Sequence, residues 1–206
     1  ATPVQLQAIP AALAGSDLLV SSNTGSGKTA AFLLPSIQRL QTEPTIKGMG
    51  PRVLVLTPTR ELALQVEKAA MTYGKDLRRF RTACLVGGAP YGLQLKRLSQ
   101  PVDVVVATPG RLIDHLERGK IDFSRLEVLV LDEADRMLDM GFVDDIHAIA
   151  ARCPESRQTL LFSATLDGVV GTLASELTRD AQRIEIEAAP KQEAKIEQRL
   201  LYADNM

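Results

Sequence analysis

The sequence predicts an α/β fold in which helices cover both faces of a central, mostly parallel sheet. Two observations lead to this prediction. Short apolar runs recur along the chain, and they are continuous rather than alternating, as expected of strands buried on both faces. Amphipathic stretches with a helical spacing of apolar residues lie between these runs. Because strand and helix alternate along the chain, we expect a doubly wound sheet.

Each strand is predicted by its own short run. In chain order, the apolar runs are Leu18–Val20, Val53–Leu56, Ala83–Val86, Val104–Val106, Val128–Leu131 and Leu160–Phe162. The run from Ala83 is the weakest of these. The later run Arg183–Glu187 is also strand-like. All of them are short enough to be strands rather than helices.

Two of the intervening helices carry specific signals. Four apolar residues are spaced four, three and four positions apart, which places them on one helical face: Leu62, Val66, Ala69 and Tyr73. Further along, Thr108 followed by Pro109 predicts a helix start, with threonine as the N-cap and proline at the first helical position.

Two stretches are predicted to lack regular structure. Gln41–Pro51 carries two prolines and two glycines between a helix and a strand, so we expect a loop. Ala188–Lys195 contains Pro190 and is interpreted as a linker between domains. Residues 1–187 then form one domain, and residues 188–206 are the linker and the first residues of a second domain. Because the chain does not open with Met, we also expect its natural start to lie upstream.

The composition is that of an ordinary soluble domain. The 206 residues are 45% hydrophobic and 24% charged, with a net charge of −1, so bulk charge does not indicate a nucleic-acid-binding protein. We see no signal peptide and no apolar run long enough to span a membrane. Cys84 and Cys153 lack metal-ligand spacing and are expected to be reduced core thiols of a cytoplasmic protein. His115 and His147 stand alone and are interpreted as ordinary histidines.

A glycine-rich segment after the first strand predicts a phosphate-binding loop. It reads Ser22-Asn23-Thr24-Gly25-Ser26-Gly27-Lys28-Thr29 and opens a helix. The two glycines let successive backbone N–H groups face one point, and the helix N-terminus adds partial positive charge there. Lys28 is suited to the β- and γ-phosphates of a nucleotide, and Thr29 to Mg²⁺. The alternative is a turn that merely joins strand to helix, since Ser22 replaces the usual glycine.

A phosphate loop needs an acidic residue on a neighbouring strand to hold the metal ion. Asp132-Glu133-Ala134-Asp135 directly follows the run Val128–Leu131. We expect Asp132 to hold Mg²⁺, directly or through water, and Glu133 to orient and deprotonate the attacking water. A charged turn after a buried strand is the alternative, and it is disfavoured because Lys28 is also present.

Six unusual segments all follow predicted strands. They are Ser22–Thr29, Pro58-Thr59-Arg60-Glu61-Leu62-Ala63, Gly87-Gly88, Thr108-Pro109-Gly110-Arg111, Asp132–Asp135 and Ser163-Ala164-Thr165. Ligands of open parallel sheets bind outside the carboxyl ends of the strands, so these segments are expected to share one edge. Small residues, hydroxyls and arginines dominate them, a mixture that suits phosphates. The edge has more such groups than ATP needs, which indicates a second phosphate-bearing ligand.

Taken singly, the weaker of these segments are more often helix caps and turns. The basic residues near the end of one predicted helix, Lys75, Arg78, Arg79 and Arg81, are interpreted as a solvated helix end rather than as a nucleic-acid site.

Together, these segments resemble the motifs of the DEAD-box RNA helicases of superfamily two, in family order. Thr2-Pro3-Val4-Gln5 resembles the Q motif, Thr24–Thr29 motif I, Pro58–Ala63 motif Ia, Asp132–Asp135 motif II and Ser163–Thr165 motif III. Gly87-Gly88 and Thr108–Arg111 resemble the further RNA-backbone motifs. The sequence of residues 135–142 resembles that of bacterial RhlE-like members. The resemblance implies a RecA-like P-loop NTPase domain that uses ATP and Mg²⁺ and binds the sugar-phosphate backbone of RNA without sequence specificity.

The resemblance also implies roles for individual residues. Gln5 would read the adenine edge, and residues 24–29 would bind the nucleotide. Pro58, Thr59, Arg60, Gly87, Gly88, Thr108, Pro109, Gly110 and Arg111 would contact RNA. Asp135 and the hydroxyls of Ser163 and Thr165 would link ATP hydrolysis to strand separation.

Some features depart from the family pattern. Ser22 and Asn23 stand where the family commonly has Ala and Gln. The aromatic residue that stacks on adenine and the second RecA-like domain, with its arginine finger, lie outside this chain. We therefore expect the chain alone to bind nucleotide weakly and to be almost inactive.

Two other classes of function stay open. One is a different P-loop enzyme such as a DNA translocase, against which the Gln5 region and Ser163–Thr165 argue. The other is a non-enzymatic module that docks RNA or proteins, against which Lys28, Asp132 and Glu133 argue.

Overall fold

A computed structural model describes residues 1–23, 25–44 and 46–186, and the following account is confined to them. The predicted linker and the start of the predicted second domain lie outside the described residues. Seven parallel strands form one sheet, in the order β3-β4-β2-β5-β6-β1-β7. They are β1 (Leu18–Ser21), β2 (Val53–Leu56), β3 (Thr82–Leu85), β4 (Val104–Ala107), β5 (Val128–Leu131), β6 (Gln158–Ser163) and β7 (Gln182–Glu185). Every predicted strand is therefore present.

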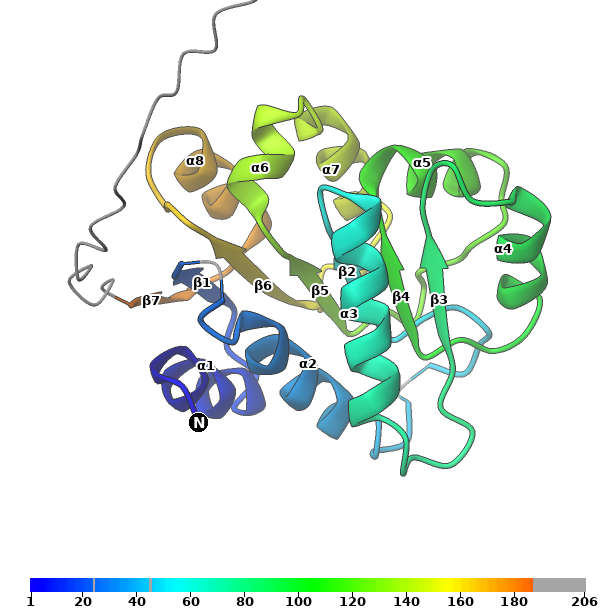
Figure 1. Ribbon diagram of the computed structural model, residues 1–206, viewed down its shortest axis with the longest axis horizontal. Coiled ribbons are helices and arrows are strands. Elements are labelled where there is room, and N and C mark those ends of the chain that lie inside the picture. Colours follow the sequence, from blue (N-terminus) through cyan, green and yellow to red (C-terminus); the bar gives the residue numbers. More distant parts are fainter. Residues whose placement is uncertain (24, 45, 187–206) are drawn as a thin grey trace, which may run out of the picture.

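Helices cover both faces of the sheet, as predicted (Figure 1). On one face lie α1 (Pro3–Leu13), α2 (Lys28–Arg39) and α3 (Arg60–Tyr73), and on the other α5 (Pro109–Glu117), α6 (Ala134–Asp139), α7 (Val143–Ala150) and α8 (Gly168–Leu177). The short helix α4 (Tyr91–Leu98) contacts the edge strand β3. Among the described residues, no helix combines the length and the apolar character that crossing a membrane requires.

Strand β2 shows why the apolar runs are continuous. Successive side chains of a strand point to opposite faces of the sheet. Val53 and Val55 accordingly join the core under α1, α2 and α3, while Leu54 and Leu56 join the core under α5 to α8. All four side chains are fully buried. A strand in the middle of a doubly covered sheet must therefore be apolar at every position.

The helix signals are confirmed with one correction. Helix α5 begins at Pro109 after the N-cap Thr108, as predicted. The buried stripe of α3, however, consists of Ala63, Val66, Glu67 and Ala70, and Tyr73 is exposed. The predicted stripe is thus rotated by about one position. Small alanines let α3 approach the sheet closely, and Glu67 is buried because Arg97 and Thr82 bind its carboxylate.

The loop between α2 and β2 is held by a buried arginine. Within the part of residues 41–51 that the structure describes there is no helix or strand, as predicted. Arg52 is 4% exposed and pairs with Glu127 through two hydrogen bonds, of 2.5 and 3.1 Å. It also donates to the main-chain carbonyls of Arg39, Leu40 and Thr42. This network joins the end of α2 to the amino ends of β2 and β5.

The two cysteines are buried, unpaired thiols, as predicted. Burial raises the pKa of Cys84 and of Cys153 to about 12, so both stay protonated at neutral pH. They are therefore core side chains rather than nucleophiles.

Candidate functional site

The six segments singled out in the sequence lie at the carboxyl ends of their strands, and the sheet order divides them into two halves. Strands β3, β4 and β2 are neighbours, and they lead into Gly87-Gly88, Thr108–Arg111 and Pro58–Ala63. Strands β5, β6 and β1 are also neighbours, and they lead into the acidic segment, Ser163–Thr165 and the phosphate loop. One edge of one sheet therefore carries a hydroxyl- and arginine-bearing half beside a half with the features of a nucleotide site.

The phosphate loop curls tightly into the start of α2. Gly25 has φ +79° and Gly27 has φ +90°, values that favour glycine, and Gly27 is the N-cap of α2. Lys28 is buried and its Nζ donates to the Ser22 carbonyl at 3.1 Å. The Ser22 hydroxyl accepts from Ser26 Oγ at 3.1 Å. Ser22, which departs from the usual glycine, is thus part of the loop's internal scaffold. The predicted residue Thr24 lies outside the described residues.

Gln5 connects helix α1 to this loop. Its Nε2 donates to the Gly27 carbonyl at 3.2 Å, and its Oε1 accepts from the Thr2 backbone N–H at 3.0 Å, which forms a capping box at the start of α1. A Cβ added at Gly27 would lie 2.6 Å from Gln5 Nε2. The carboxamide therefore touches the loop directly, and the φ of +90° at Gly27 is what favours glycine there.

Asp132 is a buried carboxylate with an unused oxygen. It follows β5, is 3% exposed, and its Oδ1 has no hydrogen-bond partner in the described part of the chain. Burial raises the pKa of Asp132 to about 6, and the nearby Glu133 carboxylate also raises it, while Lys28 lowers it. A buried oxygen of this kind is suited to a cation. Thr29, the second residue of α2, is partly buried and offers the second predicted oxygen ligand.

Glu133 adopts a strained backbone conformation. Its φ of +54° and ψ of +52° are left-handed, which is uncommon for a residue other than glycine, and it is the N-cap of α6. Its side chain is 20% exposed and pairs with Arg136 at 3.5 Å. Strain of this kind persists where surrounding structure enforces it, and it is concentrated at functional sites. The turn after β5 places Glu133 next to Asp132, and its carboxylate raises the pKa of Asp132.

Hydrogen bonds join the acidic segment to the segment after β6. The Asp135 backbone N–H donates to Ser163 Oγ at 3.3 Å, and the Ala164 N–H donates to Asp135 Oδ2 at 3.3 Å. Ser21 Oγ, from the strand before the phosphate loop, donates to the Ala164 carbonyl at 3.0 Å. The Thr165 hydroxyl instead accepts from the Asp167 N–H at 3.3 Å. Asp135 and Ser163 are thus in contact, and Thr165 joins them through its backbone N–H on Ser163 Oγ.

In the other half of the edge, Arg60 lies over the turn after β3. Thr59 is the N-cap of α3 and accepts from the Leu62 N–H at 3.3 Å. Arg60 is exposed, and a Cβ at Gly88 would lie 3.0 Å from its Nη1. Gly88 has φ +70°, a backbone conformation that favours glycine. Pro58, which is also predicted to contact RNA, is buried.

The segment after β4 contacts the same turn from the other side. The Thr108 N–H donates to the Leu85 carbonyl at 3.1 Å, and Arg111 Nη1 donates to the Ala89 carbonyl at 3.4 Å. Gly110 is exposed, and Pro109 is buried at the first position of the helix. Arg60 and Arg111 therefore flank the turn that contains Gly87 and Gly88.

Sequence reasoning missed two residues that support this turn. Gln94 is 3% exposed and His115 is fully buried, and they hydrogen-bond to each other beneath the turn. No local pattern in the sequence marked Gln94, which is the one buried residue of α4. The interpretation of His115 as an ordinary core histidine holds for its burial but omits its partner.

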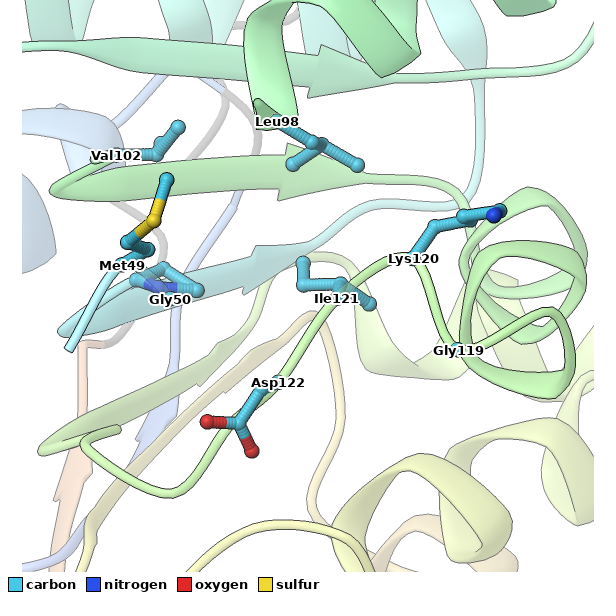
Figure 2. Close-up of a pocket in the computed structure, with 9 residues that line it drawn as sticks. Met49, Gly50, Leu98, Val102, Gly119, Lys120, Ile121 and Asp122 are labelled. Atoms are coloured by element: carbon cyan, nitrogen blue, oxygen red, sulfur yellow. The ribbon is translucent and has the colours of Figure 1, made fainter. Parts of the chain in front are cut away.

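A separate pocket lies at the other end of the strands, near the amino ends of β2 and β4 (Figure 2). Apolar side chains of Met49, Leu98, Val102 and Ile121 line it together with Lys120 and Asp122. None of these residues belongs to the six segments. The candidate site is therefore the carboxyl edge rather than this pocket.

Comparison with known proteins agrees with the geometry. A family model described as DEAD/DEAH box helicase matches residues 2–173. The ATP-dependent RNA helicase DeaD of Escherichia coli (strain K12) is 46% identical over 188 residues, which are 91% of this chain and 29% of that protein. The probable ATP-dependent RNA helicase DDX17 of Mus musculus is 49% identical over 186 residues, which are 90% of this chain and 28% of that protein. This chain thus spans less than a third of the length of either relative.

The fold is also found among solved structures. The crystal structure of a DEAD box protein from the hyperthermophile Methanococcus jannaschii matches with a TM-score of 0.82 at 35% identity, over 90% of this chain and 50% of that chain. A hypothetical ATP-dependent RNA helicase from Sulfolobus tokodaii matches with a TM-score of 0.80 at 39% identity, over 90% of this chain and 52% of that chain. Together with the all-parallel sheet, these likenesses confirm the predicted RecA-like α/β fold.

Proposed function

This chain belongs to the DEAD/DEAH box helicase family, and on that premise we propose that it is the nucleotide-binding part of an ATP-dependent RNA helicase. The observation that carries the proposal is the divided edge of the sheet. On one half lie a phosphate loop and a buried carboxylate whose Oδ1 has no partner among the described residues, and on the other lie two arginines around a glycine turn. One rigid sheet therefore supports both a nucleotide and a second phosphate-bearing polymer.

The nucleotide half binds and activates ATP in this proposal. Backbone N–H groups of the loop and the N-terminus of α2 hold the phosphates, and Lys28 exchanges the Ser22 carbonyl for a phosphate oxygen. Thr29 and Asp132 hold Mg²⁺, which when bound neutralises charge on the phosphates. The buried and unpaired Asp132 Oδ1 supports this assignment. Glu133 orients the attacking water and accepts its proton. Gln5 contacts the adenine edge and the loop together.

The RNA half binds backbone rather than bases. Arg60 and Arg111 supply positive charge, and exposed backbone around Gly87, Gly88 and Gly110 allows close approach of phosphates. Hydroxyl groups of Thr59 and Thr108 add hydrogen-bonding capacity, and Pro58 and Pro109 complete the predicted set of RNA-contact residues in these segments. Contacts of this kind carry no sequence information, and 2′-hydroxyl contacts distinguish RNA from DNA.

Asp135 and Ser163 join the acidic segment to the segment after β6, both within the nucleotide half. Because Ser163 Oγ accepts N–H groups from both Asp135 and Thr165, a shift of the acidic segment on hydrolysis moves the segment after β6. We infer that this contact couples the nucleotide state to RNA binding. In the intact protein, closure of two domains over the cleft bends one strand and separates a short duplex.

A second RecA-like domain completes the site in this proposal. It supplies the arginine finger, which is worth about 10³ to 10⁵ in rate in other NTPases. Residues 1–206 alone should therefore bind nucleotide weakly and show almost no RNA-stimulated hydrolysis. A bacterial RhlE-like subgroup stays a prediction, since relatives from a bacterium and a mammal are similarly identical to this chain. Cytoplasmic localisation also stays a prediction.

The test compares RNA with DNA of the same sequence as activators of ATP hydrolysis by the full-length protein. The proposal predicts that single-stranded RNA stimulates strongly and that DNA does so weakly. Equal stimulation by DNA would favour a DNA translocase. An absence of any ATP hydrolysis would favour a module that only docks RNA or proteins.

A further inference from the structure

A buried polar cluster lies beneath the Gly87–Gly88 turn. It comprises Gln94 and Tyr91 of α4 and His115 of α5. Gln94 is 3% exposed and His115 is fully buried, although both are polar. Buried polar groups are retained where they are hydrogen-bonded, so their partners indicate what the cluster does.

The carboxamide of Gln94 holds both ends of the turn. Its Nε2 donates to the Val86 carbonyl at 3.0 Å and to the Ala89 carbonyl at 3.3 Å. These two carbonyls flank Gly87 and Gly88, which are themselves exposed. The two hydrogens of one amide nitrogen therefore fix the separation of the residues on either side of the glycines.

This arrangement determines how His115 binds. With Gln94 Nε2 committed to two carbonyls, Gln94 Oε1 faces His115 Nε2 at 3.0 Å and can only accept. His115 Nε2 therefore carries the hydrogen, and Nδ1 is the bare nitrogen. Nδ1 has no hydrogen-bond partner among the residues that the structure describes, which suits a neutral ring. Burial lowers the pKa of His115 and keeps the ring in this form.

The cluster also links the turn to the helix that begins at Pro109. The Tyr91 ring stacks on the His115 ring, with centroids 4.5 Å apart and planes at 8°. Arg111 lies 5.6 Å from the Tyr91 centroid and donates to the same Ala89 carbonyl as Gln94. The turn after β3 and the first residues of α5 are thus one hydrogen-bonded unit.

We propose that Gln94 and His115 are positioning residues for RNA: Gln94 fixes the Gly87–Gly88 turn, and His115 fixes Gln94 relative to Arg111. The inference rests on the proposed function and deepens it. Neither side chain reaches the surface, so neither contacts RNA itself. They act by keeping the exposed glycine backbone and the Arg111 guanidinium in one geometry, so that RNA binding does not have to order them.

The experiment measures RNA-stimulated ATP hydrolysis by the full-length protein carrying Gln94→Met, which keeps the side-chain length but removes all three hydrogen bonds. The concentration of single-stranded RNA that gives half-maximal stimulation should rise about tenfold, while the KM for ATP changes less than about twofold. His115→Phe keeps a ring stacked on Tyr91 and removes one bond, so it should give a smaller rise in the same direction.

Ile184→Val is the matched control for lost stability. Ile184 is buried in β7, at the edge of the sheet opposite β3, and the substitution removes one core methyl group. It should lower the thermal midpoint and leave both the RNA and the ATP dependence unchanged.

The outcomes separate the inference from the proposed function. A selective rise in the RNA requirement of Gln94→Met, beyond that of Ile184→Val, supports the inference. Equal changes in the RNA and ATP dependence, or behaviour like that of the control, would overturn it while leaving the proposed function intact. A lack of RNA stimulation in the unsubstituted protein would overturn both.

Discussion

Replacing Asp132 with asparagine should stabilise the protein in the absence of metal and nucleotide. Burial raises the pKa of this carboxyl from 3.8 to about 6, so the folded protein ionises it at a cost that the unfolded chain does not bear. At about 1.4 kcal/mol for each pH unit, the cost is about 3 kcal/mol. Asp132→Asn removes the charge from a 3% exposed position and should raise the free energy of unfolding by about that amount at pH 7.5.

The difference in the free energy of unfolding between the two proteins should shrink as the pH falls. Above pH 6 both the folded and the unfolded state are ionised at Asp132, so the full cost is present. Between pH 6 and pH 3.8 the folded state takes up the proton first, and the cost shrinks. Below pH 3.8 both states are protonated and the two proteins should be about equally stable. Carboxyl groups remote from Asp132 are common to both proteins and cancel in the difference, whereas Glu133 and Asp135 interact with Asp132 itself.

The assay is urea unfolding of the two proteins from pH 4 to pH 8 in a metal chelator. Asp76→Asn, at an exposed loop position, is the matched control and should change stability by less than about 0.5 kcal/mol at every pH. Mg²⁺ with a non-hydrolysable ATP analogue should then stabilise the unsubstituted protein but not Asp132→Asn. An asparagine variant that is less stable at pH 7.5, or a difference that does not vary with pH, would refute the reasoning.

Three further changes test other parts of the structure. Arg52→Met should lower the free energy of unfolding by about 3 kcal/mol in urea, because Glu127 and three main-chain carbonyls lose their buried partner. Gly27→Ala should weaken nucleotide binding at least about tenfold in a fluorescence titration, because φ is +90° and the new Cβ would lie 2.6 Å from Gln5 Nε2. Burial lowers the pKa of His115, so its contribution to stability is lost as the pH falls below 6.5, and His115→Phe should remove that component from the pH profile of unfolding.

Each of these three predictions would be contradicted by a specific result. Unchanged stability of Arg52→Met would show that the network at the amino ends of β2 and β5 is not stabilising. Undiminished nucleotide affinity in Gly27→Ala would mean that the loop rearranges freely. If His115→Phe loses stability below pH 6.5 as much as the unsubstituted protein does, other groups cause that loss.

Much of the fold could be predicted because the strands of a parallel sheet covered on both faces are continuous apolar runs in the sequence. Val53–Leu56 is apolar at every position since both of its faces are buried, and the same holds for Val128–Leu131. The face of α3 was harder to predict. Periodicity alone favoured Tyr73 and missed Glu67, because burial of a carboxylate depends on partners from β3 and α4 that are distant in the sequence.

The same division holds for the site. Gly27, Lys28 and Asp132 were predictable, since each residue type follows from what a phosphate or a metal ion requires at a strand end. Their surroundings were not, because the unpaired Asp132 Oδ1 and the left-handed Glu133 arise from packing around them. Gln94 and His115 were missed because no local pattern indicates that two separate helices place them in contact.

The most direct test of the central claim is ATP hydrolysis by the full-length protein, with and without single-stranded RNA, beside a Glu133→Gln variant. We expect strong stimulation by RNA that the variant loses, together with retained nucleotide binding in the variant, because Glu133 acts on the attacking water rather than on the phosphates. Hydrolysis that RNA does not stimulate, or full activity in Glu133→Gln, would contradict the account.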